Sequence, residues 1–313
     1  MLFIYRKQVF LFFLALLLSS CQSNSSSHAK TNNKAYSSSH IITEQYELML
    51  PDNKIEAVLV LFGGFPESIA DIKREFDIQA LAKAYNIAVL YANINQRLWL
   101  EEEEKRSIAS GLQKAILNHA LPTDKLAIGG FSSGGNVSML LSNFLIDNNE
   151  FNIQPNAVFL IDSPIDLVAL YKSSEKNIER NFSQVSVDES KWIIDSLFQS
   201  FDHPSNALQQ YEKYAVFTSI SNSIQNLEKL QSTKIRLYTE PDSTWWLKNR
   251  KAEFTETNAY YIKQLALQLK QKGFERVAYI PSHEKGYRAN GDRHPHSWSI
   301  VDKKDLLEWI IKE

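Results

Sequence analysis

A short segment of the chain has the residue types and spacing of a catalytic nucleophile: Gly-Phe-Ser-Ser-Gly at residues 130–134. It directly follows the apolar run 126–128 and precedes the apolar, helix-prone stretch 137–141. In a G-x-S-x-G turn the chain passes so sharply from strand to helix that the Ser backbone is strained and its neighbours must be small. This setting predicts that Ser132 is a nucleophile presented at the end of a strand.

A nucleophilic Ser needs a base. Its hydroxyl is weakly reactive until a neighbouring imidazole removes the proton, so the fold must bring a His to Ser132. The His residues after position 40 are His119, His203, His283, His294 and His296. His119 precedes the Ser132 segment and His203 lies in a stretch without strands, which leaves the three His residues near the C-terminus as candidates.

Alternating short apolar runs and helical stretches must position these residues. This alternation predicts an α/β fold with a mostly parallel, doubly wound sheet. Several runs are almost wholly apolar, as expected of strands buried on both faces. The expected strands are 58–62, 87–91, 126–128, 157–161, 235–238 and 277–280, with an antiparallel edge pair from 45–50; the expected helices are 69–85, 101–119, 136–145, 257–272 and 303–311.

The alternation stops between Asp162 and Lys234. This stretch contains no convincing strand but has helical segments at 190–201 and 223–231. Loops of this length are unusual inside a compact domain, which favours an inserted helical cap at about 163–233 within a domain covering 41–313. Such a cap would overhang the carboxyl ends of the strands, where open α/β sheets bind ligands.

These features together resemble the α/β-hydrolase superfamily, from about Gln45 to the end of the chain. The resemblance implies the chain order nucleophile, acid, His. It also implies a His in the loop between the last strand and the terminal helix, which favours His296 in Pro-His-Ser-Trp at residues 295–298. His294 is the nearby competitor, and His283 lies too close to the preceding strand.

The same resemblance implies an acid after an earlier strand, to hold the imidazole in the useful tautomer. The segment 238–242 offers Glu240 and Asp242. Asp242 is favoured because it lies farther into the loop, and Glu240 is the alternative acid. Asp162 is a third candidate, for which a helix N-cap or turn role is favoured.

Two backbone N–H groups should stabilise the oxyanion that forms during acyl transfer. One is expected at Ser133, directly after the nucleophile. The turn that begins at Gly63 resembles the His-Gly-x-Pro turn of epoxide hydrolases and dehalogenases, which implies Phe65 as the second donor. Gly63 stands where that pattern has His, and Ser132 stands where those enzymes have a nucleophilic Asp, so ester or amide hydrolysis is favoured.

The expected activity is therefore that of a serine hydrolase acting on an ester or peptide bond through an acyl-enzyme, without a cofactor. The substrate class stays open among lipid esters, acetylated sugars and short peptides. Two alternatives remain: a catalytically silent binding protein on the same scaffold, and a metal-dependent hydrolase that uses Asp292, His294 and His296.

The N-terminus resembles an export signal of a bacterial lipoprotein. Arg6 and Lys7 precede a short apolar stretch, 9–18, and Leu-Ser-Ser-Cys at 18–21 resembles a lipobox in which Cys21 becomes lipidated. We expect a signal peptide at 1–20, a flexible polar tether at 21–40 and attachment to the cell envelope. With 34 basic and 36 acidic residues and no basic stripe, nucleic acid is not an expected partner.

Overall fold

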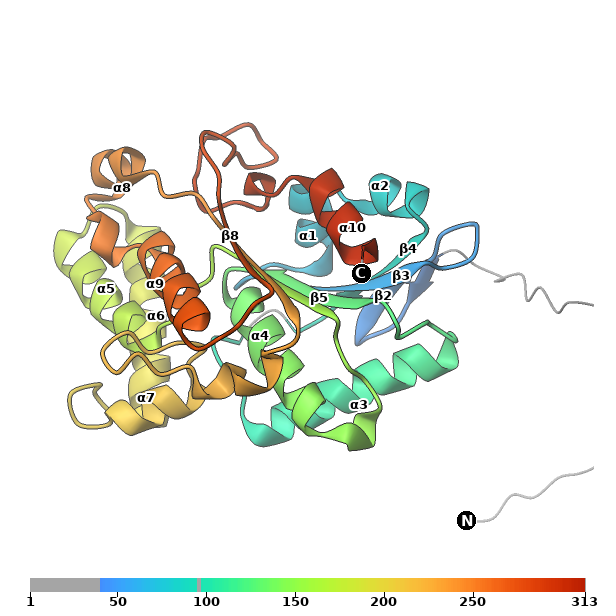
Figure 1. Ribbon diagram of the computed structural model, residues 1–313. Helices are drawn as coiled ribbons and strands as arrows, with labels where there is room; N and C mark the ends of the chain where they lie inside the picture. Colours follow the sequence, from blue (N-terminus) through green and yellow to red (C-terminus); the bar gives the residue numbers. More distant parts are fainter. Residues whose placement is uncertain (1–39, 95–96, 313) are drawn as a thin grey trace, which may run out of the picture. The chain divides into compact units, whose positions relative to one another are not determined.

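The computed structural model describes residues 40–94 and 97–312. Within them, eight strands form one sheet in the order β1-β2-β4-β3-β5-β6-β7-β8 (Figure 1). β1 and β2 pair antiparallel, as do β2 and β4, and the remaining neighbours are parallel. The strands are β1 (His40–Ile42), β2 (Tyr46–Met49), β3 (Ala57–Phe62), β4 (Ile87–Ala92), β5 (Leu126–Phe131), β6 (Ala157–Ile161), β7 (Lys234–Thr239) and β8 (Val277–Pro281).

The central strands are buried on both faces. In β3, Val58, Val60 and Phe62 pack into one hydrophobic cluster, and the alternate residues Leu59 and Leu61 pack into another on the opposite face. This two-sided burial explains why the strands read as continuous apolar runs in the sequence. The prediction of a mostly parallel, doubly wound sheet is confirmed.

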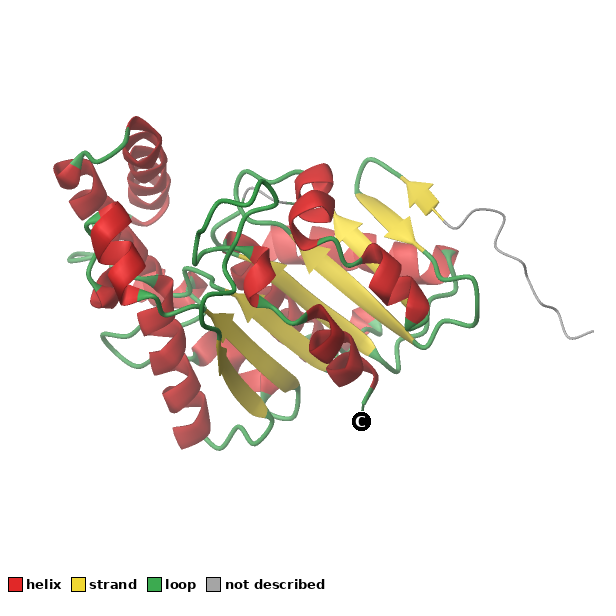
Figure 2. Ribbon diagram, turned by 90° about the horizontal axis from the view of Figure 1, so that it is seen from above, coloured by secondary structure: helices red, strands yellow, loops and turns green. Residues whose placement is uncertain are grey.

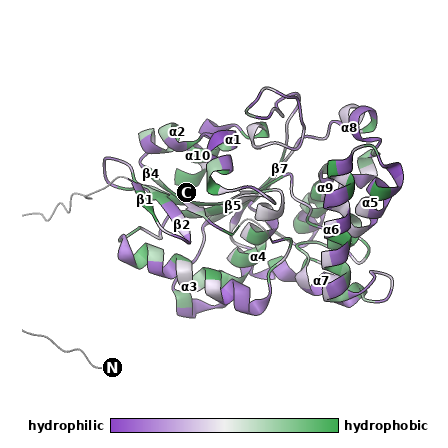
Figure 3. Cartoon of the chain, turned by 180° about the vertical axis from the view of Figure 1, so that it is seen from behind, coloured by the Kyte–Doolittle hydropathy of each residue, from purple (hydrophilic) through white to green (hydrophobic). Residues whose placement is uncertain are grey.

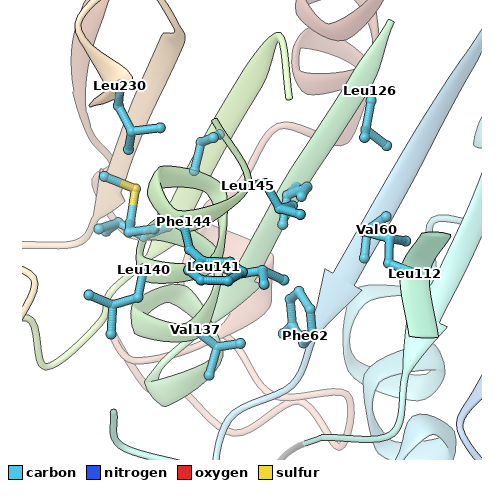
Figure 4. Packing of buried hydrophobic residues seen from close by; sticks show 14 of the residues in the cluster. Val60, Phe62, Leu112, Leu126, Val137, Leu140, Leu141, Phe144, Leu145 and Leu230 are labelled. Atoms are coloured by element: carbon cyan, nitrogen blue, oxygen red, sulfur yellow. The ribbon is translucent and has the colours of Figure 1, made fainter. Parts of the chain in front are cut away.

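Helices cover the sheet on both sides (Figure 2). α3 (Glu102–Asn118), α4 (Ser133–Asp147) and α9 (Asn258–Gln271) contribute to the first cluster, part of which is drawn in Figure 4. α1 (Ile69–Phe76), α2 (Gln79–Ala84) and α10 (Lys303–Ile311) contribute to the second. The helices carry both hydrophobic and hydrophilic residues along their length (Figure 3), as expected of elements with one buried face.

The single helix expected over 69–85 is two helices. α1 begins at a capping box formed by Ser68 and Asp71, and it ends where Asp77 adopts a left-handed conformation with φ of 39°. The Asp77 N–H donates to the Lys73 carbonyl oxygen and so closes the last turn of α1. A second helix, α2, then begins at Gln79.

The segment between β6 and β7 is helical. It contains α5 (Leu167–Arg180), α6 (Gln184–Phe201), α7 (Leu208–Tyr214) and the 3₁₀ helix η2 (Gln225–Leu230). α5, α6 and α7 stand to one side of the sheet in Figures 1 and 2 and share a hydrophobic cluster of their own. α6 and η2 occupy the two helical segments expected here, whereas α5 and α7 were not anticipated. The cluster is formed by Leu98, Leu167, Val168, Tyr171, Ile193, Leu197, Phe201, Tyr211 and Ala215.

The expected signal peptide 1–20, the tether up to residue 39 and the lipidation site Cys21 lie outside the described residues. In the part of the chain that the structure describes, no helix has the length and apolar character needed to cross a membrane.

Candidate active site

Ser132 occupies a strained turn between β5 and α4. Its backbone has φ of 52° and ψ of −128°, a conformation that is costly for a residue with a side chain. The Ser132 N–H donates to the carbonyl oxygen of Ile161, 2.9 Å away, at the end of the neighbouring strand β6. This is the conformation that the G-x-S-x-G pattern predicts.

The small residues around Ser132 allow backbone segments to touch. A Cβ atom on Gly130 would lie 2.4 Å from the backbone of Gly134, and one on Gly134 would lie 2.4 Å from the carbonyl oxygen of Gly63. Real Cβ atoms do not approach other atoms so closely. Glycine at these positions therefore lets α4 start directly against the end of β5 and the turn after β3.

His296 contacts a carboxylate, and that carboxylate is Asp162. The distance from His296 Nδ1 to Asp162 Oδ2 is 2.6 Å, and the Asp162 side chain is only 4% exposed. Thr239 Oγ1 donates to Asp162 Oδ1 over 2.5 Å, and Asn258 donates to the Asp162 carbonyl oxygen. Asp162 is thereby fixed at the end of β6, with one carboxylate oxygen turned to the imidazole.

Asp242, the acid favoured from the sequence, does not contact His296. Its Oδ1 accepts from the N–H of Trp245 and caps α8 (Ser243–Arg250), and its Oδ2 accepts from Arg293 Nη2 at 2.7 Å. The expectation that Asp242 orients His296 is therefore corrected: the structure gives this contact to Asp162.

Glu240 does not contact His296 either. Its side chain is 1% exposed and forms an ion pair with Arg293. The carboxylate also accepts hydrogen bonds from Ser282 Oγ and from the backbone N–H groups of Lys285 and Gly286. Glu240 therefore fastens the loop that leads to His296 and is not in a position to act as the alternative acid.

The N-cap role assigned to Asp162 belongs to Asp166. Asp166 Oδ1 accepts from the N–H groups of Val168 and Ala169 at the start of α5. The sequence 161–166 contains two Asp residues, and only the structure separates the one that caps the helix from the one that faces His296.

The two expected oxyanion donors flank the nucleophile. Ser133 is the first residue of α4, and the Phe65 N–H in the turn after β3 donates to Ser133 Oγ over 3.0 Å. That contact was not foreseen, and it shows that the Phe65 amide is directed toward the residue that follows the nucleophile. A Cβ atom on Gly64 would lie 2.7 Å from Ser132 Cβ, so the turn is packed directly against the elbow.

Glu67 ties this turn to the segment after His296. Its carboxylate accepts from the Gly64 N–H at 2.8 Å and from Trp298 Nε1 at 3.0 Å. Burial raises the pKa of the Glu67 carboxyl, an effect that these hydrogen bonds oppose. Nothing in the sequence connects Glu67 with Trp298, which lies 231 positions later.

Ser132 and His296 open into one cavity of about 690 Å³. Its size is within the usual range of ligand pockets. Ser132 Oγ and His296 Nε2 make no hydrogen bond with another described residue, so both are available to a ligand. Besides the site residues, the cavity is lined by residues of the cap and of α8, among them Leu170, Asn177, Phe182, Trp192, Ile193, Trp246 and Arg250.

The cap touches the oxyanion turn through aromatic stacking. The rings of Phe65 and Trp192 are 4.1 Å apart at their centroids and 6° from parallel. Because Trp192 belongs to α6, this stacking fixes α6 against the oxyanion turn and forms the wall of the cavity beside Phe65.

His294 has a different role from His296. Its Nδ1 accepts from the backbone N–H of His296, and burial, together with the electrostatic influence of His296, Arg288 and Arg250, lowers the pKa of His294 to about 2. His294 is thus a neutral imidazole. Among the described residues, no three His, Cys, Asp or Glu side chains are grouped so as to hold a metal ion, and the Asp292, His294, His296 set does not form such a group.

The structure is similar to solved hydrolases over most of its length. It superposes on the fluorophosphonate-binding serine hydrolase F of Staphylococcus aureus with a TM-score of 0.51 and 11% identity, covering 86% of this chain and 93% of that one. An esterase from Rhizomucor miehei matches with a TM-score of 0.51 and 14% identity over 87% and 83% of the two chains. Carboxyl esterase 2 from the fungus Tuber melanosporum matches with a TM-score of 0.51 and 16% identity over 85% and 80%. No protein-family model and no curated protein matches the sequence.

These likenesses, at low sequence identity, concern the fold. Together with the strand order and the helices on both faces, they show that the chain has the α/β-hydrolase fold, as its sequence resemblance implies. The site residues must be argued from their own geometry.

Proposed function

We propose that this protein is a serine hydrolase that cleaves esters through an acyl-enzyme, with Ser132 as nucleophile, His296 as base and Asp162 as the acid that orients His296. One observation carries the proposal. The buried Asp162 carboxylate lies 2.6 Å from His296 Nδ1, and the imidazole lines the same cavity as the strained Ser132.

The contact between Asp162 and His296 determines the tautomer. A carboxylate can only accept, so it holds the neutral imidazole with its proton on Nδ1 and leaves Nε2 as the basic nitrogen. When Ser132 Oγ attacks the ester carbonyl carbon, Nε2 takes the hydroxyl proton, and the nearby carboxylate stabilises the resulting imidazolium.

The remaining steps follow from the same groups. The carbonyl oxygen becomes an oxyanion that accepts hydrogen bonds from the N–H groups of Phe65 and Ser133. To donate to the oxyanion, the Phe65 N–H gives up its hydrogen bond to Ser133 Oγ. His296 then returns its proton to the departing alcohol oxygen. Water, deprotonated by His296, attacks the acyl-enzyme carbonyl, and Ser132 leaves with the proton.

Ester hydrolysis is preferred over other acyl transfers because several proteins with this fold are named esterases or serine hydrolases. The test is a panel of 4-nitrophenyl esters with acyl chains of increasing length, assayed with the wild type and with Ser132→Ala. The proposal expects turnover by the wild type only. Equal turnover by the Ser132→Ala variant would refute it.

A further inference from the structure

Two guanidinium groups line the proposed active-site cavity without a carboxylate partner. Arg250, at the end of α8, lies over the rings of Phe182 and Trp245, with its Cζ atom 5.2 and 5.6 Å from their centroids. Arg288, in the loop before His296, lies 5.9 Å from the ring of Phe131. Neither forms an ion pair with a described carboxylate.

Three of the other charged groups of the cavity, Arg180, Glu256 and Glu67, already have partners. Arg180 pairs with Glu256, which also pairs with Lys176 outside the cavity. Glu67 is buried and accepts from Gly64 and Trp298. Burial raises the pKa of Glu67, and the nearby Arg288 charge lowers it without an ion pair between them. The remaining lining carboxylate, Glu189, is exposed on α6 and has an electrostatic effect on Arg250 without forming an ion pair with it.

His294 lies beside Arg250, and it is a poor acceptor for that side chain. The distance from Arg250 Nη2 to His294 Nε2 is 3.4 Å, which is long for a hydrogen bond. Because Nδ1 of the neutral His294 accepts from the His296 N–H, its proton belongs on Nε2. Nε2 is then a donor, and among the described residues neither the Arg250 guanidinium nor the His294 Nε2–H has an acceptor.

These donors are close to the reacting groups. The ring of Phe131 lies 4.4 Å from the ring of His296. Arg288 Cζ lies 5.9 Å from the centroid of the same Phe131 ring. The rings of His294 and His296 are 6.3 Å apart. Arg250 and Arg288 each lower the pKa of His294, as positive charges near an imidazole do.

Arg250 and Arg288 are two positive charges without an ion pair in a partly desolvated cavity, and this arrangement favours the binding of an anion. We propose that the substrate is an ester whose acyl or alcohol part carries a carboxylate, and that Arg250 and Arg288, with the N–H of His294, bind that anion. The planar, bidentate guanidinium is well suited to this task. The inference rests on the proposed esterase activity, since it names the substrate of the same site.

The experiment compares matched anionic and neutral esters. For the acyl side, the 4-nitrophenyl monoester of adipic acid is compared with 4-nitrophenyl 6-methylheptanoate, in which an isopropyl group replaces the carboxylate. For the alcohol side, 4-acetoxybenzoate is compared with 4-acetoxybenzamide. The measured quantity is the ratio of kcat/KM for the anionic ester to kcat/KM for its neutral partner.

We expect the wild type to prefer the anionic ester in one of the two pairs, and Arg250→Gln and Arg288→Gln each to reduce that ratio by about ten- to a hundredfold, as for loss of a hydrogen bond to a charged group. Arg276→Gln is the matched control, because Arg276 is exposed and lies outside the cavity, and it should leave the ratio unchanged. A wild type that prefers the neutral ester in both pairs, or a ratio that neither variant alters, would overturn the inference.

Failure of the esterase proposal would appear differently. If neither ester of either pair is hydrolysed, the anion site is tested by calorimetric titration of monomethyl adipate into the Ser132→Ala protein. Binding that weakens with added salt and is lost in the Arg250→Gln and Arg288→Gln backgrounds supports the anion site. Absence of binding overturns it.

Discussion

Asp162 Oδ2 lies 2.6 Å from His296 Nδ1, although 134 positions separate these residues in the chain. Asp162 follows β6, and His296 follows β8, two strands away in the sheet. The carboxyl ends of parallel strands meet at one edge of the sheet, and this is where the two side chains come together with Ser132, which follows β5.

Asp162→Asn should therefore reduce kcat by about 10⁴-fold, because an amide can donate to Nδ1 and favour the wrong tautomer. Asp242→Asn is the matched control. Asn caps a helix as well as Asp does, so α8 should persist and kcat should stay within a few fold of the wild type. Steady-state kinetics with a 4-nitrophenyl ester measures kcat for both variants. The reverse pattern would restore Asp242 as the acid.

Glu240→Gln should mainly lower the stability of the protein rather than its activity. It removes the charge that faces Arg293 in a buried setting, while Asp242 remains as a second partner, so a loss of about 2–3 kcal/mol in the free energy of unfolding is expected. Urea denaturation measures it. Unchanged stability combined with a loss of activity as large as that of Asp162→Asn would instead make Glu240 the acid.

Gly64→Ala should lower activity without unfolding the protein. The added Cβ would lie 2.7 Å from Ser132 Cβ and 3.2 Å from the Phe131 carbonyl oxygen, which displaces the nucleophile from the oxyanion turn. We expect a loss of about a hundredfold or more in kcat/KM, comparable to loss of an oxyanion donor.

Gly111→Ala supplies the control for Gly64→Ala. Gly111 lies within α3, and a Cβ there would meet nothing closer than 3.5 Å. This variant should keep full activity, and its free energy of unfolding should rise by up to about 1 kcal/mol, because Ala is the better helix former. Equal activity of the two variants would contradict the packing of the Gly64 turn against Ser132.

His294 predicts how stability depends on pH. Its folded pKa of about 2 is far below the usual value near 6.5, so below pH 6.5 the unfolded chain binds a proton that the folded protein does not. The contribution of His294 is fully present above pH 6.5 and is lost as the pH falls, at no more than about 1.4 kcal/mol per pH unit. His294→Gln should flatten this loss between pH 6.5 and 4.

His203→Gln is the control for this titration, since the His203 side chain lies on the cap and is 42% exposed. It should leave the pH dependence of the unfolding free energy as in the wild type. A flattening equal to that of His294→Gln would show that the slope does not come from the buried imidazole.

Much of the fold could be predicted because local sequence patterns indicate its strands and the turn at Ser132. Runs of apolar residues mark β3 and β6, and Ser132 stands out because its glycine neighbours are required by contacts of 2.4 Å. His296 could be placed because a terminal helix follows it at Lys303.

The partner of His296 could not be predicted for a physical reason. Asp162, Asp166, Glu240 and Asp242 all follow strands that end at the same sheet edge, and a carboxylate can cap a helix, pair with an Arg or orient a His with equal ease. The choice depends on where Thr239 and Arg293 place their donors. Those contacts join residues that are distant in the chain, so no local pattern reports them.

The most direct test of the central claim is covalent labelling of Ser132. The wild type, Ser132→Ala and Asp162→Asn are treated with a fluorophosphonate probe, and the modified peptide is located by mass spectrometry. The account predicts rapid modification of Ser132 in the wild type, none in Ser132→Ala and strongly slowed modification in Asp162→Asn. A folded wild type that is not labelled, or is labelled at another residue, would contradict it.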